Sequence, residues 1–202
     1  MTETKVVSKP LAKHFELSTT QSPSTNKEKN EISSIPYSSA VGSLMYDMIC
    51  TRPDIAHAVG TVSRFLSNHE KKHWGAVKWI LHYLKGTLDM ELCFGSGKSE
   101  LVCYTDSDLR GNLDNLNSTY VYLITFGGGA ISWQSRLQKC IALSTTEAEY
   151  IAITEGAKEL LWMKEFIKDL DFEQSIFVLF CDNKSAIYLT KHSTFHSKVQ
   201  EY

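Results

Sequence analysis

The sequence predicts an α/β protein in which a small helical subdomain precedes a mixed β-sheet with helices packed against it. Residues 37–86 repeat apolar side chains at helical spacing, and residues 101–135 contain three strand-like runs. A long helical pattern over residues 145–170 then leads to an apolar strand at residues 176–180 and a short final helix. The order β-β-β-α-β-α is typical of a mixed sheet covered by helices.

The composition is that of an ordinary globular protein. The 202 residues are 43% hydrophobic and 22% charged, and they give room for one domain plus a smaller subdomain. No apolar run has the roughly eighteen residues of a membrane span, and no secretory signal opens the chain. We therefore expect an intracellular protein, cytoplasmic or nuclear, with no membrane partner. The net charge of −2 argues against a freestanding nucleic-acid-binding protein.

The cysteines are odd in number, scattered and without metal-ligand spacing, and most lie in apolar runs. We expect them to be buried, reduced thiols. They are Cys50, Cys93, Cys103, Cys140 and Cys181.

Residues 1–36 are expected to form an extended arm rather than a packed element. They are polar, rich in Ser, Thr, Lys and Glu, and interrupted by Pro10, Pro23 and Pro36.

Three amphipathic helices are expected in residues 37–98, as a small bundle. The first ends before Pro53, which suits the first turn of the second, and the third ends at Gly86. A strand-like piece and a glycine-rich linker at residues 87–98 complete the subdomain. The apolar stripes comprise Val41, Leu44, Met45 and Met48, then Ile55, Val59, Val62 and Leu66, then Trp74, Val77, Ile80, Leu81 and Leu84.

The third helix carries His73, Lys78, His82 and Lys85 on or near its expected outer face. A solvated polar face and a surface that contacts a nucleic-acid backbone both explain this pattern. We keep both interpretations open and take His73, Lys78 and Lys85 as candidate nucleic-acid contacts.

Residues 99–202 are expected to form the second domain. Its first three strands are Leu101–Tyr104, Tyr120–Phe126 and Ala130–Ser135, and glycines 127–129 supply a hairpin turn between the last two.

The long helix begins with two glutamates that have different expected roles. Ser144 followed three residues later by Glu147 is a capping box, which keeps Glu147 at the solvated helix start. Glu149 instead opens the apolar stripe of the helix, where a carboxylate is costly unless positive charge lies beside it. The stripe comprises Ala152, Ile153, Gly156, Ala157, Leu160 and Leu161.

Two aspartates directly follow strands that are expected to be buried, Asp106 after the first and Asp182 after the fourth. Sites in open α/β sheets form outside the carboxyl ends of strands, where these acids and Glu149 would converge. Three adjacent carboxylates need divalent cations to neutralise them, and such oxygen ligands favour Mg²⁺ or Mn²⁺. Taken singly, a turn residue, a helix-start charge and an N-cap explain the same acids.

The motifs around these acids resemble the RNase H domain of copia-type LTR retrotransposon Pol polyproteins. They are Thr105-Asp106, Ser144-Thr-Thr-Glu-Ala-Glu-Tyr150 and Cys181-Asp182-Asn183. The first half resembles the end of the reverse transcriptase in the same polyprotein. Its motifs are Tyr37-x-x-x-Val41-Gly-Ser-Leu-Met45, Thr51-Arg-Pro-Asp54, His73-Trp74 and Tyr83-Leu-Lys-Gly86-Thr87.

This resemblance implies an RNase H-like fold and a two-metal nuclease that hydrolyses the RNA strand of RNA–DNA hybrids. It implies Mg²⁺ or Mn²⁺ as cofactor and the remainder of a Pol polyprotein as partner. It places the catalytic and metal-binding carboxylates at Asp106, Glu149 and Asp182. The aspartate pair of a polymerase active site is not among the matching motifs.

The sequence also departs from the family pattern. The family's Asp-Trp pair is Asp108-Leu109 here, and a glycine before its hairpin tyrosine is Val121. A fourth carboxylate and a final helix are expected after Phe195-His-Ser197, but only five residues follow, so we expect a truncated domain with weakened activity. Two alternatives remain. One is a degenerate remnant that at most binds nucleic acid. The other is an integrase-like or transposase-like nuclease, which needs a different carboxylate spacing and a DNA-binding module.

Overall fold

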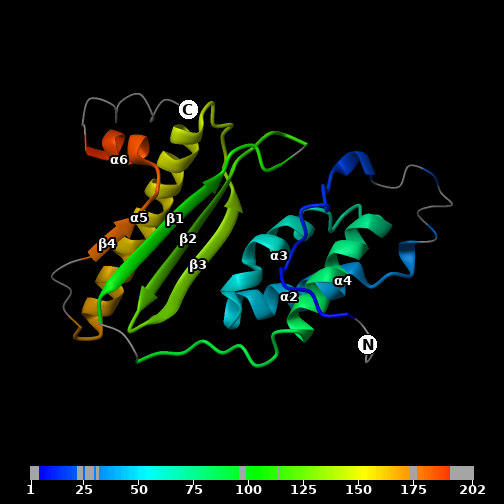
Figure 1. Ribbon diagram of the computed structural model, residues 1–202, viewed down its shortest axis with the longest axis horizontal. Coiled ribbons are helices and arrows are strands. Elements are labelled where there is room, and N and C mark those ends of the chain that lie inside the picture. Colours follow the sequence, from blue (N-terminus) through cyan, green and yellow to red (C-terminus); the bar gives the residue numbers. More distant parts are fainter. Residues whose placement is uncertain are drawn as a thin grey trace. The chain divides into compact units, whose positions relative to one another are not determined.

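The chain divides into two compact units, residues 1–92 and residues 93–202 (Figure 1). This computed structural model describes residues 5–21, 25, 30, 32–95, 99–112, 114–172 and 177–191. The predicted C-terminal truncation concerns residues 192–202, which lie outside the described residues.

The boundary between the units lies earlier than the predicted one at residues 98/99 because residues 93–95 pack on the hairpin of the second unit. The Gly95 N–H donates to the Gly127 carbonyl at 2.7 Å. A side chain at Gly129 would collide with the Phe94 ring. The strand-like piece predicted in residues 87–98 is wrong for the described residues 87–95, which form turns and irregular backbone.

The first unit contains the three expected helices. Helix α2 spans Tyr37–Cys50, and α4 spans Lys71–Lys85. Between them a 3₁₀ turn, η2 (Pro53–Ile55), runs directly into α3 (Ala56–Ser63). Pro53 therefore begins the 3₁₀ turn that leads into the second helix, rather than the first turn of α3 itself.

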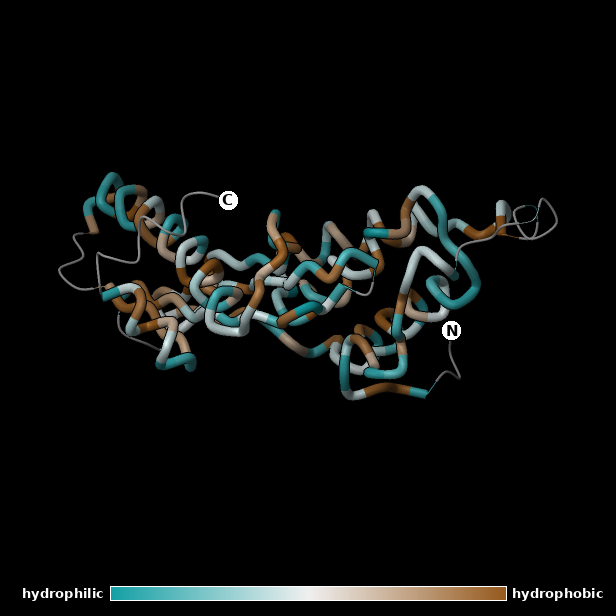
Figure 2. Tube along the Cα trace, turned by 90° about the horizontal axis from the view of Figure 1, so that it is seen from above, coloured by the Kyte–Doolittle hydropathy of each residue, from teal (hydrophilic) through white to brown (hydrophobic). Residues whose placement is uncertain are grey.

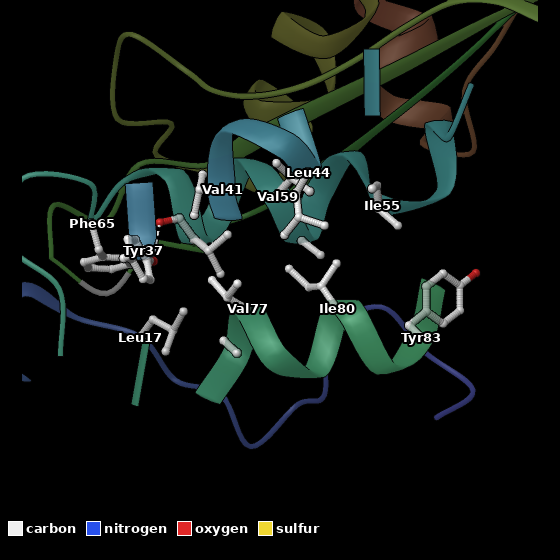
Figure 3. Packing of buried hydrophobic residues seen from close by; sticks show 13 residues of the cluster. Leu17, Tyr37, Val41, Leu44, Ile55, Val59, Phe65, Val77, Ile80 and Tyr83 are labelled. Carbon is white, nitrogen blue, oxygen red and sulfur yellow. Dashed lines mark hydrogen bonds between the residues drawn. The ribbon is translucent and has the colours of Figure 1, made fainter. Parts of the chain in front are cut away.

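The three helices share one apolar core. Val77 and Ile80 of α4 point toward Val41 and Val59 on the other two helices (Figure 3). Two residues of the predicted stripes lie outside it, because Met45 is 36% and Leu66 is 38% exposed. Phe65 is buried in place of Leu66, since α3 ends at Ser63 and the chain then leaves the helical phase.

Residues 5–21 are packed on the core of the first unit, which corrects the expected extended arm (residues 1–36) over that range. Leu17 is 7% exposed, and Val7, Leu11 and Phe15 contact the same core. The only regular element in described residues 5–21 is a 3₁₀ turn, η1 (Thr19–Gln21). The prediction failed because it was based on the overall polar composition, whereas the few apolar residues of the segment are enough to hold it on the core.

The second unit is built on a four-stranded mixed sheet with the order β3-β2-β1-β4 (Figure 1). Strands β1 (Leu101–Asp108), β2 (Thr119–Phe126) and β3 (Gly129–Leu137) are antiparallel neighbours. Strand β4 (Phe177–Phe180) pairs with β1 in parallel. The expected order β-β-β-α-β-α and the α/β fold class are therefore confirmed.

Among the strands that the structure describes, β4 lies at the edge of the sheet, whereas its apolar sequence predicted a buried strand. Phe177 and Val178 are each 38% exposed, and Phe180 is 52% exposed. An edge strand has a neighbour on one side only, so apolar residues on both faces do not ensure burial.

Helix α5 (Thr145–Asp169) covers one face of the sheet and packs most closely on β1 at Gly156. A Cβ there would lie 2.5 Å from Thr105 Cγ2, so glycine allows this approach. The predicted stripe is buried except for Leu161, which is 53% exposed, and Ala157, which is half-buried. Helix α6 (Lys184–Lys191) follows β4.

Hydrophobic and hydrophilic stretches alternate along the trace in both units, as one-sided burial of helices and strands requires (Figure 2). Among the described residues, no helix is long and apolar enough to cross a membrane.

Candidate metal centre

Asp106 and Asp182 come from adjacent parallel strands at matching positions. Tyr104 of β1 aligns with Phe180 of β4, and each aspartate lies two residues further along its chain. Asp106 does not follow the strand, as predicted, but lies within β1, because β2 extends the pairing to Asp108. Both aspartates are exposed and stand at the same end of the sheet.

Glu149 enters this end of the sheet from the first turns of α5. It is 6% exposed, and its Oε1 accepts hydrogen bonds from the Ser107 hydroxyl at 2.8 Å and the Ser107 N–H at 3.0 Å. A buried carboxylate needs such donors, and β1 supplies them because Ser107 lies on the strand face that α5 covers.

One backbone group joins Asp106 to Glu149. The Ser107 N–H also donates to Asp106 Oδ1 at 2.8 Å, so both carboxylates share this donor. The two negative charges are therefore close to each other.

Cys181 and Asp182 lie on the other side of Glu149. The Cys181 thiol donates to Glu149 Oε2 at 3.6 Å. One ligand atom from each of Glu149, Cys181 and Asp182 lies within 4.8 Å of the other two. The structure thus brings the three predicted acids to one end of the sheet. Asp106 joins through Ser107 and is not a member of the 4.8 Å cluster.

Two simpler roles proposed for these acids belong to other residues, since Asn183 caps α6 and Glu147 is the acidic residue in the first turn of α5. Helix α6 is capped by Asn183, whose Oδ1 accepts from the Ala186 N–H at 3.0 Å, so Asp182 is not the N-cap. The start of α5 is capped by Ser144, which accepts from the Glu147 N–H at 3.2 Å.

Glu147 is part of the cap of α5, although the box differs in detail from the predicted one. Its carboxylate reaches back to the Leu143 N–H at 2.8 Å rather than to the Ser144 N–H. Glu147 and Glu149 therefore occupy the two different environments that the sequence predicted.

Electrostatics at the site favour a bound cation. Burial raises the pKa of Glu149 and the charge of Asp106 raises it further, while the hydrogen bonds from Ser107 and Cys181 lower it. Burial also raises the pKa of Cys181, which keeps it a thiol. A cation between these carboxylates would offset the repulsion between them.

The donor set fits a hard divalent ion. Asp106, Glu149 and Asp182 offer carboxylate oxygens, the ligands that Mg²⁺ and Mn²⁺ prefer. Cys181 offers sulfur, a poor ligand for these ions, and its proton is already donated to Glu149. The oxygens would therefore hold the ion, with Cys181 beside it.

Sequence reasoning missed Ser107 and Cys181. The alternation of Leu101, Cys103 and Thr105 on one strand face continues to Ser107, and this signal was available. The expectation that the cysteines are buried holds for Cys103 only: Cys140 and Cys181 are half-buried, and Cys50 and Cys93, at the ends of apolar runs, are exposed.

The candidate nucleic-acid contacts on α4 do not all lie on its outer face. His73 is fully buried, so its assignment is corrected: its Nδ1 accepts from the Glu70 N–H at 2.9 Å, and its ring stacks on Phe65. Lys78 is exposed and Lys85 is half-buried. Trp74 and Leu81, expected to point inward, are half-buried against the core.

The chain is similar to known proteins over most of its length. It is 58% identical over 200 residues to the retrovirus-related Pol polyprotein from transposon TNT 1-94 of Nicotiana tabacum, across 99% of this chain and 15% of that polyprotein. It is 37% identical over 166 residues to the retrovirus-related Pol polyprotein from transposon RE2 of Arabidopsis thaliana, across 81% of this chain and 11% of that polyprotein.

A third relative is much shorter. The chain is 45% identical over 130 residues to the secreted RxLR effector protein 161 of Plasmopara viticola, across 64% of this chain and 92% of that protein. No family model and no solved structure matches the chain. The chain spans about 15% of the tobacco polyprotein.

Proposed function

The chain belongs to the Pol polyproteins of copia-type LTR retrotransposons, and we propose on this basis that its second unit is an RNase H-type nuclease domain. Its substrate is the RNA strand of an RNA–DNA hybrid. One observation supports this most: three carboxylates from β1, α5 and the end of β4 gather around Ser107 and Cys181.

In this proposal Asp106, Glu149 and Asp182 hold Mg²⁺ or Mn²⁺ ions. When bound, such ions lower the pKa of a water molecule and stabilise the charge that develops on a phosphodiester during hydrolysis.

The protein contributes a fixed geometry. Ser107 and Cys181 orient both oxygens of Glu149, and the parallel pairing of β1 with β4 sets the spacing of the two aspartates. Asp106 and Asp182 are exposed, so the phosphate of a double-stranded substrate can reach them without entering a deep pocket. The wide minor groove of the hybrid and its 2′-hydroxyls would supply selectivity for RNA.

A labelled RNA–DNA hybrid incubated with the 202-residue chain tests this proposal. We expect the RNA strand to be cleaved faster with Mn²⁺ than with Mg²⁺, because Mg²⁺ demands near-ideal octahedral geometry and three acids supply few ligands. Asp106→Asn should abolish cleavage, and Glu147→Gln, the matched control at the cap, should not.

Cleavage that survives Asp106→Asn would contradict the assignment. Hybrid binding without cleavage in either metal would favour a non-catalytic remnant that binds nucleic acid.

A further inference from the structure

Gln138 is a buried polar residue for which the catalytic proposal assigns no role. It directly follows β3 and is 2% exposed. Its Nε2 donates to the Ala148 carbonyl at 2.9 Å. Its backbone is also fixed: the N–H donates to the Ser118 carbonyl and the carbonyl accepts from Asn117 Nδ2, both at 2.8 Å. Gln138 therefore ties the end of the loop between β1 and β2 to the first turn of α5.

The chemistry of this side chain indicates a specific task. A buried amide is costly, and its Oε1 has no hydrogen-bond partner among the described residues. An apolar side chain of similar size would fill the space without that cost. The feature that such a side chain lacks is the hydrogen bond to Ala148.

Ala148 immediately precedes Glu149, so the hydrogen bond from Gln138 fixes the backbone next to this candidate metal ligand. The hydrogen bond from the Glu147 N–H to the Ser144 hydroxyl defines where α5 begins. It joins two residues at the start of the helix and therefore does not attach the helix to the sheet. The Gln138 bond instead fixes the first turn of α5 to the sheet. Two turns later, Gly156 packs closely against Thr105 and Cys103 of β1.

We propose that Gln138 is a positioning residue that holds Glu149 against Ser107, an inference that rests on the proposed function of the site. The Glu149–Ser107 hydrogen bonds are 2.8 and 3.0 Å long, and a small displacement of the α5 start breaks such bonds because they weaken steeply with distance and angle. Glu149 would then lose its orientation toward a shared ion.

The test compares Gln138→Met with Gln134→Met. Both replace a glutamine by a side chain of similar size, but Gln134 bonds to Tyr120 and not to α5. The first measurement is the amide signal of Ser107 in a ¹H–¹⁵N spectrum of the metal-free chain, with Glu149→Gln to show how that signal responds to the carboxylate. The second is Mn²⁺ affinity by electron paramagnetic resonance.

Gln138→Met is expected to move the Ser107 signal toward its position in Glu149→Gln. It is also expected to weaken Mn²⁺ binding by roughly 10–100-fold, the usual effect of losing a residue that orients a metal ligand. Gln134→Met should leave both unchanged. Gln138→Asn, one methylene shorter, serves as a second variant that keeps the amide and should behave like Gln138→Met.

An unmoved Ser107 signal in folded Gln138→Met would overturn the proposal. Loss of the folded spectrum in both Gln138 variants would also overturn it, because the residue would then serve the fold rather than Glu149. If the unaltered chain binds no Mn²⁺, the proposed function fails, while the Ser107 signal still decides the role of Gln138.

Discussion

Replacing Gly156 by alanine tests the close packing that brings α5 onto β1. The added Cβ would lie 2.5 Å from Thr105 Cγ2 and 3.2 Å from Cys103 Sγ, both inside ordinary contact distance. Thr105 is 7% exposed, and its hydroxyl donates to the Phe180 carbonyl at 3.2 Å, so it cannot rotate away without losing that bond. We therefore expect α5 to move outward.

Two opposing effects set the magnitude. Overpacking costs about 1–3 kcal/mol, and alanine favours a helix over glycine by about 0.8–1.0 kcal/mol. The free energy of unfolding of the second unit should therefore fall by about 1 kcal/mol. Gly42 in α2 is the matched control, because nothing lies within 4 Å of the Cβ that alanine would add. Gly42→Ala should stabilise the first unit by about 1 kcal/mol.

The assay is unfolding in urea, monitored in each unit by hydrogen exchange. Peptides from β1 and α5 report on Gly156→Ala, and peptides from α2 and α4 report on Gly42→Ala. Because Gly156 lies two turns after Glu149 on the same face of α5, the first variant should also weaken Mn²⁺ binding. If Gly156→Ala stabilised its unit as much as Gly42→Ala does, the inferred close approach of α5 to β1 would be wrong.

Three further outcomes are expected. Burial raises the pKa of Glu149, so the folded state holds this proton more tightly than the unfolded chain. That stabilisation is complete below the usual glutamate pKa and is lost as pH rises through the raised value. In EDTA, Glu149→Gln should therefore resist urea better than the unaltered chain at pH 8, with a smaller difference at pH 4; the opposite trend would contradict the burial argument. Ser107→Ala keeps the shared N–H but removes one hydrogen bond to a charged carboxylate, worth about 1.5–3 kcal/mol. It should lower Mn²⁺ affinity in calorimetric titrations, and an unchanged affinity would exclude this hydroxyl from the site. If exposed Lys78 contacts a hybrid phosphate, Lys78→Gln should reduce the slope of log K against log salt by about 1, whereas an equal slope would indicate a solvated face.

The sequence was most informative where one periodicity dominates. The apolar stripe of α5 distinguished buried Glu149 from Glu147 at the cap, because about 200° of helix separates the two. The hairpin between β2 and β3 was also predictable, since Gly127 and Gly128 both adopt positive φ.

The remaining features depend on tertiary structure. Among the described strands, β4 pairs with β1 alone, and its apolar sequence does not predict which strands it pairs with. His73 was assigned by its polarity, although its spacing from Val77 and Ile80 places it on the buried face. Gln138 lies outside any periodic pattern, so only its contact with Ala148 indicates a role.

We propose above that Asp106, Glu149 and Asp182 form one site for a divalent ion. Mn²⁺ binding to the 202-residue chain, followed by electron paramagnetic resonance, tests it most directly in Asp106→Asn, Glu149→Gln, Asp182→Asn and the control Glu147→Gln. Each of the first three substitutions should weaken the same binding event, and Glu147→Gln should leave its affinity unchanged. Equal affinity in all four variants, or a loss confined to Glu147→Gln, would contradict the claim.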